Sequence, residues 1–215
     1  MDNMNTTEAV ESVAPAWLVF IDVETTGLLP GVNGLLSIGA YHPWSRERFY
    51  LECRPVGAFK VDAEAMRVNG QRLEEVCERE MDDFRAVGRL FDWLDKLRGE
   101  HGVSKFVMAG KNPEFDRKWL GGFGILERGD YILSRRMIDV HACALALAAA
   151  RGLDAPAMRI AELYKALGLP EEPEPHNAVN GAFFAWLALA KIGAMTGVFT
   201  GAGNGKTTRE GVGPA

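Results

Sequence analysis

The chain has 215 residues, of which 47% are hydrophobic and 25% charged, with a formal net charge of −5. The length suits one domain with a substantial core, and the composition is typical of a soluble globular enzyme. No apolar run approaches the ~20 residues of a transmembrane helix. The negative charge gives no sign of nucleic-acid binding but does not exclude it, because bound metal ions can attract phosphate.

The two ends of the chain are predicted to lie outside the fold. Residues 1–16 are polar and acidic, without the basic and apolar regions of a signal peptide, and we expect a disordered tail there. Residues 17–195 are expected to form the single domain, and 196–215 a second disordered tail. Three scattered cysteines (Cys53, Cys77 and Cys143) without a C-x-x-C motif indicate reduced thiols, and therefore a cytoplasmic protein.

The first element is a run of five apolar residues, Trp17–Ile21, predicted to be a buried strand. Asp22 and Glu24 follow at a spacing of two, which places both side chains on the same side of an extended chain. Neighbouring carboxylates repel each other, and each costs free energy to desolvate. A divalent cation would relieve both costs. The pattern alone also fits a strand that simply ends in polar residues.

Periodicity, turn residues and caps predict the later elements. Asp82 is expected to cap a helix that ends near Gly99, and Pro113 to start another with Asp116 in its first turn. The first of these helices has an apolar face of Phe84, Val87, Leu90, Phe91, Leu94 and Leu97. Further strands are expected over 35–41, 48–53, 105–109 and 137–140, and further helices over 63–68, 71–78, 142–150, 160–167 and 178–192. This order predicts an α/β fold with a mixed sheet, whose first three strands are antiparallel, flanked by helices.

Three stretches of the sequence resemble the sequence blocks of a known family. They are F-I-D-V-E-T-T-G (20–27), A-G-K-N-P-E-F-D (109–116) and P-H-N-A-V-N (175–180). In this order they resemble the DEDDh 3′→5′ exonucleases, which have a ribonuclease H-like fold and include ribonuclease T and oligoribonuclease. The resemblance covers roughly residues 17–192, and three blocks in order are far more specific than one.

The resemblance implies hydrolysis of phosphodiester bonds at the 3′ ends of single-stranded DNA or RNA, with two Mg²⁺ or Mn²⁺ ions. Asp22 would bridge both ions, Glu24 would hold one with the attacking water, and Asp116 would lie beside the second. His176 would take the proton from that water, a role that suits a side chain titrating near neutrality. The products would be nucleoside monophosphates.

The resemblance also implies where the substrate lies. Backbone donors near Thr25 and Gly27 would receive the 3′-terminal nucleotide, with Leu28 as a wedge against its base. Asn112 is expected beside the substrate, where it supports the turn that carries Asp116. A homodimer is left open.

One ligand of the family is missing from this sequence. The third block of the family runs H-x-A-x-x-D, but the fifth residue after His176 is Gly181, and its neighbour Asn180 is an amide. Residues 178–195 contain no acid; the nearest are Glu171, Glu172 and Glu174. Three alternatives follow: a weakened enzyme, an inactive module that binds nucleic acid or acts as a scaffold, or an acid supplied from elsewhere. A remoter alternative is an unrelated phosphohydrolase acting on small phosphates. An aspartate introduced at position 181 is expected to raise activity.

Overall fold

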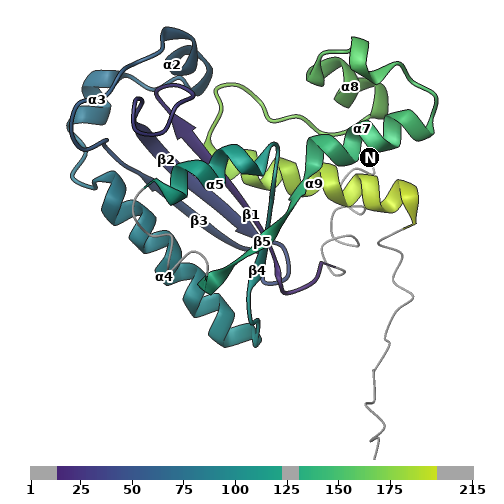
Figure 1. Cartoon of the computed structure of the whole chain (residues 1–215), viewed down its shortest axis with the longest axis horizontal. Coiled ribbons are helices and arrows are strands. Elements are labelled where there is room, and N and C mark those ends of the chain that lie inside the picture. The colour runs from purple at the N-terminus through teal and green to yellow at the C-terminus, as the bar shows by residue number, and fades with distance from the viewer. Residues whose placement is uncertain (1–13, 123–130, 198–215) are drawn as a thin grey trace, which may run out of the picture.

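The computed structural model describes residues 14–122 and 131–197, and a five-stranded sheet lies at its centre (Figure 1). The strand order is β3-β2-β1-β4-β5. The first three strands pair antiparallel, and β4 and β5 continue the sheet parallel to β1. The predicted mixed sheet is therefore confirmed. The strands are β1 (Leu18–Thr25), β2 (Leu35–His42), β3 (Glu47–Glu52), β4 (Phe106–Gly110) and β5 (Leu133–Asp139).

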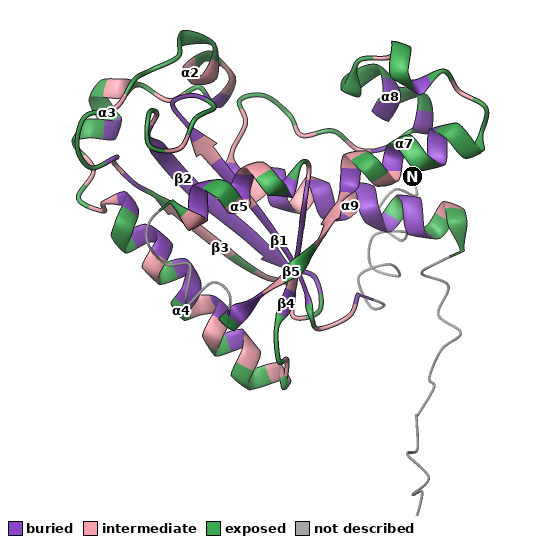
Figure 2. Cartoon of the chain, in the orientation of Figure 1, coloured by how far each residue is buried: buried purple, intermediate pink, exposed green. Residues whose placement is uncertain are grey.

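Helices cover both faces of the sheet and bury two separate cores (Figures 1 and 2). The described helices are α2 (Ala63–Asn69), α3 (Leu73–Cys77), α4 (Asp83–His101), α5 (Pro113–Gly121), α7 (Val140–Ala150), the short 3₁₀ helix η1 (Ala155–Ala157), α8 (Ile160–Leu167) and α9 (Ala178–Thr196). In β1, Val19, Ile21 and Val23 pack with α4 and α5 on one face. Leu18 and Phe20 pack with α7, α8 and α9 on the other. By this alternation, Asp22 and Glu24 belong to the α9 face.

The last helix, α9, lies against the strands at the centre of the sheet. Trp186 packs edge-to-face on Phe20, with ring centroids 5.7 Å apart. At its first turn the backbone rests directly on β2, because a Cβ added at Gly39 would lie 2.1 Å from both the carbonyl carbon of Ala178 and the nitrogen of Val179. A side chain at position 39 would therefore push the start of α9 away from the sheet. This contact fixes the part of α9 nearest to Asp22.

Helix α9 is an exception to the expectation that no apolar run approaches the length of a transmembrane helix. In the described residues this helix of 19 residues is long and apolar enough, by length and composition, to cross a membrane. More than half of its most apolar window, 56%, is buried inside the fold. More than half of α9 in this window is thus part of the core of this domain.

Other differences from the predictions concern the ends of elements and the buried face of helix α4. Helix α4 continues to His101 and ends at Gly102, whose φ of 64° is left-handed. Phe84 was predicted to lie on the buried face of α4 but is 53% exposed, because the helix turns Asp83 toward the fold instead. Residues 14–16 were predicted to belong to the tail but are part of the fold. Ala14 is fully buried in the core between the sheet and α7, α8 and α9. The remaining predicted tail residues, 1–13 and 198–215, lie outside the described chain.

Candidate active site

Two of the predicted acids, Asp22 and Glu24, lie on β1 within the sheet. Both are half-buried, whereas Val23 between them is buried on the opposite face. The strand continues to Thr25, with an irregularity in its pairing to β2 between Glu24 and Thr25. The two carboxylates therefore project from one side of β1 at its carboxyl end, where open α/β sheets place their functional groups.

The third predicted acid, Asp116, is brought to the same place by the connection from β4 to α5. Asn112 has a left-handed backbone (φ 64°), and Pro113 then starts the helix. Asp116 is only 2% exposed, and its Oδ1 accepts a hydrogen bond of 3.0 Å from the backbone N–H of Val23. Asp116 is thus held by the peptide group between Asp22 and Val23, in the segment that also carries Glu24. The side chain of Asn112 makes no capping hydrogen bond to α5. The contribution of Asn112 that the structure shows is the left-handed backbone of the turn.

Burial and mutual repulsion make these carboxylates difficult to ionise. Burial raises the pKa of Asp22 well above its ordinary value, and the charges of Asp116, Glu24 and Glu172 raise it further, while Lys111 opposes them. Burial and Glu172 raise the pKa of Glu24 to about 7. Burial raises the pKa of Asp116 to about 8 against the effect of its hydrogen bond from Val23. A divalent cation would stabilise the ionised form of these buried, mutually repelling carboxylates. The three residues therefore fit such an ion.

A pH-dependent stability follows from these pKa values. A carboxyl whose pKa is raised on folding binds a proton more tightly in the folded state, so its stabilising contribution is complete below pH ~4 and is lost as pH rises through the folded pKa. In EDTA, the free energy of unfolding should fall between pH 5 and pH 8 by about 1–3 kcal/mol. Urea unfolding at the two pH values measures this, and Glu24→Gln should reduce the fall. A stability that rises over this interval would contradict the prediction.

The position of the missing family ligand, Gly181, lies directly against Asp22. A Cβ added at Gly181 would be 2.3 Å from Asp22 Oδ2 and 3.2 Å from Glu172 Oε2. Side-chain atoms at position 181 would have to displace the end of the Asp22 side chain. The structure therefore gives the opposite expectation to the sequence: an aspartate at this position should lower activity, not raise it. Two residues near Asp22 were not predicted from the sequence to act in the site: Glu172, one of the three acids before α9, and Lys111, which lies in the second sequence block.

A test of this packing compares glycines in two helices. We expect Gly181→Ala and Gly181→Asp to displace the carboxylate of Asp22 and lower exonuclease activity by about 10-fold or more, since a misplacement near 1 Å can cost about 10²-fold. Gly88→Ala on α4 is the matched control, because a Cβ there meets nothing within 4 Å. That control should gain about 0.5–1 kcal/mol of stability from helix propensity and keep its activity. Higher activity in Gly181→Asp would refute the steric argument.

His176, the predicted base, lies just before the first turn of α9. Its backbone N–H donates to Val68 O at 3.1 Å, and the next residue, Asn177, caps α9 by accepting from Val179 N. The histidine is half-buried and lines a cleft of about 480 Å³. The cleft is formed by Lys111, His141, Ile160, Ala161, Tyr164, Glu171, Glu172, Glu174 and His176. Lys111 and Glu172 connect this cleft to Asp22 through the charge effects described above.

The loop after β1 is fixed by hydrogen bonds of its backbone and side chains. The hydroxyl of Thr25 donates to Gly27 O at 2.6 Å, and Asn69 Nδ2 donates to Thr25 O at 3.2 Å. A Cβ at Gly27 would collide with the side chain of Asn33, at 2.4 Å from Nδ2. Leu28 is 73% exposed. The loop is therefore held by these contacts and carries an exposed apolar side chain four residues after Glu24, while the predicted contacts with a nucleotide stay predictions.

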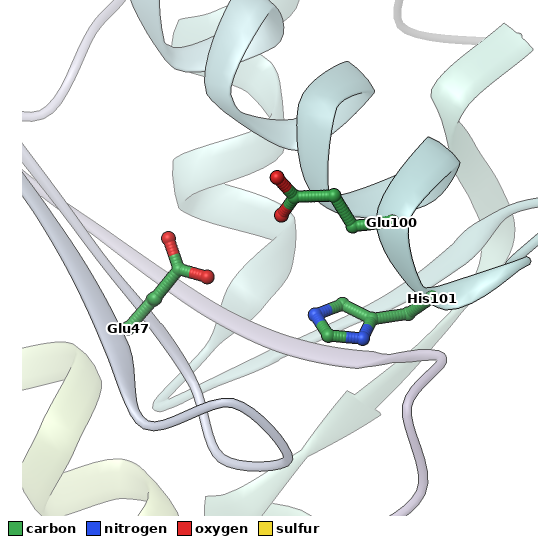
Figure 3. Close-up of side chains that lie close together, drawn as sticks. All are labelled: Glu47, Glu100 and His101. Carbon is green, nitrogen blue, oxygen red and sulfur yellow. The ribbon is translucent and has the colours of Figure 1, made fainter.

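A second group of potential metal ligands lies elsewhere, at the start of β3 and the end of α4. Within the described parts of the chain, Glu47, Glu100 and His101 alone each offer a ligand atom within 4.8 Å of the others (Figure 3). Glu47 is more than 50 residues away from the other two in the sequence, so the three meet only in the fold. Lys96 Nζ already lies 3.3 Å from Glu47 and 3.5 Å from Glu100, so a cation of the chain itself pairs with both carboxylates.

Comparison with known proteins agrees with the geometry around Asp22. No family model matches the chain. The 3′–5′ DNA exonuclease Cap18 of Escherichia coli is 28% identical over 167 residues, which cover 76% of this chain and 84% of Cap18.

Solved structures of 3′–5′ exonucleases share the fold. The nuclease domain of 3′hExo, a DEDDh family member bound to rAMP, superposes with a TM-score of 0.60 at 15% identity, covering 85% of this chain and 92% of that one. E. coli exonuclease I in complex with a dT13 oligonucleotide gives 0.58 at 18% identity; 82% of this chain is covered, but only 40% of exonuclease I. In sequence the chain is similar to a 3′–5′ DNA exonuclease, and in fold it is similar to solved exonuclease structures, with a mixed sheet of the ribonuclease H-like architecture.

Proposed function

We propose that the chain is a metal-dependent 3′→5′ exonuclease that hydrolyses phosphodiester bonds of single-stranded nucleic acid to nucleoside monophosphates. The observation that carries the proposal is the meeting of Asp22, Glu24 and Asp116 at one end of the sheet, with Val23 N–H bound to Asp116. Three carboxylates from two separate segments, each difficult to ionise, form a site for divalent cations rather than a stabilising feature of the fold.

Two Mg²⁺ or Mn²⁺ ions would be held with Asp22 shared, Glu24 on one and Asp116 on the other. Such a pair, when bound, stabilises the attacking and leaving oxygens of an in-line displacement. His176, which lies just before the first turn of α9, would accept the proton of the attacking water.

The cleft beside the carboxylates would receive the 3′ end of the strand. Lys111 supplies a cation in its wall, with Nζ 6.0 Å from the ring centroid of the buried Tyr164. A phosphate group of the strand would find a partner in this ammonium group. Exonuclease I was solved with dT13 and 3′hExo with rAMP, which supports a single-stranded substrate. Thr25, Gly27 and the exposed Leu28 would border the terminal nucleotide, with Asn112 behind them.

The competing proposal is a module that binds nucleic acid without cleaving it, favoured by Gly181. An oligonucleotide with a 5′ label, as DNA and as RNA, separates the possibilities in Mg²⁺, in Mn²⁺ and in EDTA. Stepwise shortening that EDTA abolishes supports the exonuclease. Binding without shortening supports the non-catalytic module. The absence of both binding and shortening supports a phosphohydrolase that acts on small substrates. A cytoplasmic location and a homodimer also stay proposals; light scattering of the purified chain decides between one copy and two.

A further inference from the structure

The space between α9 and Asp22 is shared by two carboxylates from different segments. Gly181 brings the backbone of α9 close enough that a Cβ would lie 2.3 Å from Asp22 Oδ2 and 2.7 Å from Asp22 Cγ. The third-nearest heavy atom to that point is Glu172 Oε2, at 3.2 Å. Glu172 therefore reaches over the first turn of α9, to the place from which a side chain at position 181 would point at Asp22.

The segment before α9 holds Glu172 in this position. Its Oε1 accepts a hydrogen bond of 2.8 Å from the backbone N–H of Asn177, the residue that caps α9. The other oxygen, Oε2, is the one near Gly181 and Asp22. Pro173 follows directly and restricts the backbone of Glu172 to extended conformations. Glu172 is half-buried, whereas Glu171 and Glu174 on either side are exposed.

The effects of Glu172 on its neighbours agree with this placement. Its charge contributes to raising the pKa of Asp22, after burial and the nearer acids, and it is the main charge that raises the pKa of Glu24. With Glu172 included, the site has four carboxylates, the number implied by the family's blocks, although α9 itself carries no acid.

We propose that Glu172 replaces the carboxylate missing from α9 and is a ligand, with Asp22, of a divalent cation in this site. The inference rests on the proposed function for the presence of the cation. The two residues then act together: because Gly181 has no side chain, there is room beside Asp22 for the carboxylate of Glu172, which comes from the loop before α9. Ligand charge is restored, and so the affinity for a hard cation is kept.

The test measures metal binding directly, in addition to cleavage. Mn²⁺ is titrated into the full chain by calorimetry and by the loss of the free-ion EPR signal, for the wild type, Glu172→Gln and Glu172→Ala. We expect both variants to bind Mn²⁺ about 10–100-fold more weakly, because one charged ligand is lost. The Gln variant keeps an oxygen for the Asn177 N–H, so its fold, checked by circular dichroism, should be retained. Glu171→Gln and Glu174→Gln remove the same charge from adjacent exposed positions and should leave the affinity within about 2-fold.

Each outcome decides the inference. Wild-type Mn²⁺ affinity in folded Glu172→Gln and Glu172→Ala overturns it, and equal weakening in the two control variants does so too, since that would be a general charge effect. If the wild type binds Mn²⁺ through Glu172 but shortens no oligonucleotide, the role of Glu172 as a ligand is supported and the exonuclease proposal is rejected. If the wild type shortens oligonucleotides and the Glu172 variants bind Mn²⁺ normally, the exonuclease proposal is supported and the role of Glu172 as a ligand is rejected. A wild type that binds no Mn²⁺ overturns both.

Discussion

Asp22→Asn should reduce the exonuclease rate by at least about 10³-fold, because the shared ligand of the proposed ions supplies several kcal/mol of transition-state stabilisation. The substitution keeps the size of the side chain and removes its charge. The metal-free protein should be as stable as the wild type or more stable at pH 8, since burial and three acidic neighbours disfavour the ionised form of Asp22. Mn²⁺ titration, the rate on a labelled oligonucleotide and urea unfolding in EDTA measure the three effects.

The combination of results matters more than the loss of activity. A variant that is inactive and also unfolded would say nothing about metal, whereas an inactive variant with raised stability in EDTA separates function from folding. Full activity in Asp22→Asn, or of the wild type in excess EDTA, rules out the metal mechanism. The stability gain should be absent at pH 4, where the wild-type carboxyl is also protonated.

His176→Ala should lower turnover by about 10²–10⁴-fold, the usual contribution of a general base. The backbone N–H of His176, which donates to Val68 O, is unaffected by the substitution. Metal affinity and oligonucleotide binding should therefore stay close to those of the wild type, and single-turnover rates isolate the chemical step. His101→Gln, at the end of α4, is the control for loss of a histidine and should retain activity. An unchanged rate in His176→Ala would mean that another group or water removes the proton.

Sequence alone predicted those parts of the site that depend on local geometry. The two-residue spacing of Asp22 and Glu24 placed them on one face of β1 because side chains alternate along any strand. Pro113 marked the first turn of α5, so Asp116 was placed correctly at the start of a helix. The alternation of apolar residues and the order of elements were likewise enough for the mixed sheet.

What sequence could not predict depends on the path of the chain between elements. Glu172 and Gly181 are nine positions apart in the sequence, and nothing local indicates that the loop brings one over the other. The resemblance marked Gly181 as a lost ligand, and only the fold shows a carboxylate beside it. The error at Phe84 has a similar origin: periodicity gave the correct helix, but which residue of its first turn meets the sheet is decided by packing.

The hydrogen bond from Val23 to Asp116 limits how this site can be altered. Its donor is a peptide group that every residue except proline carries, so no ordinary replacement at position 23 removes it. The spacing between Asp116 and the acids of β1 is therefore insensitive to side-chain variation along the strand. Mutations that retune the distances among these carboxylates must instead act from outside β1, by shifting α5 or the first turn of α9. Attempts to change ion preference or cleavage rate by engineering are best directed at those two helices.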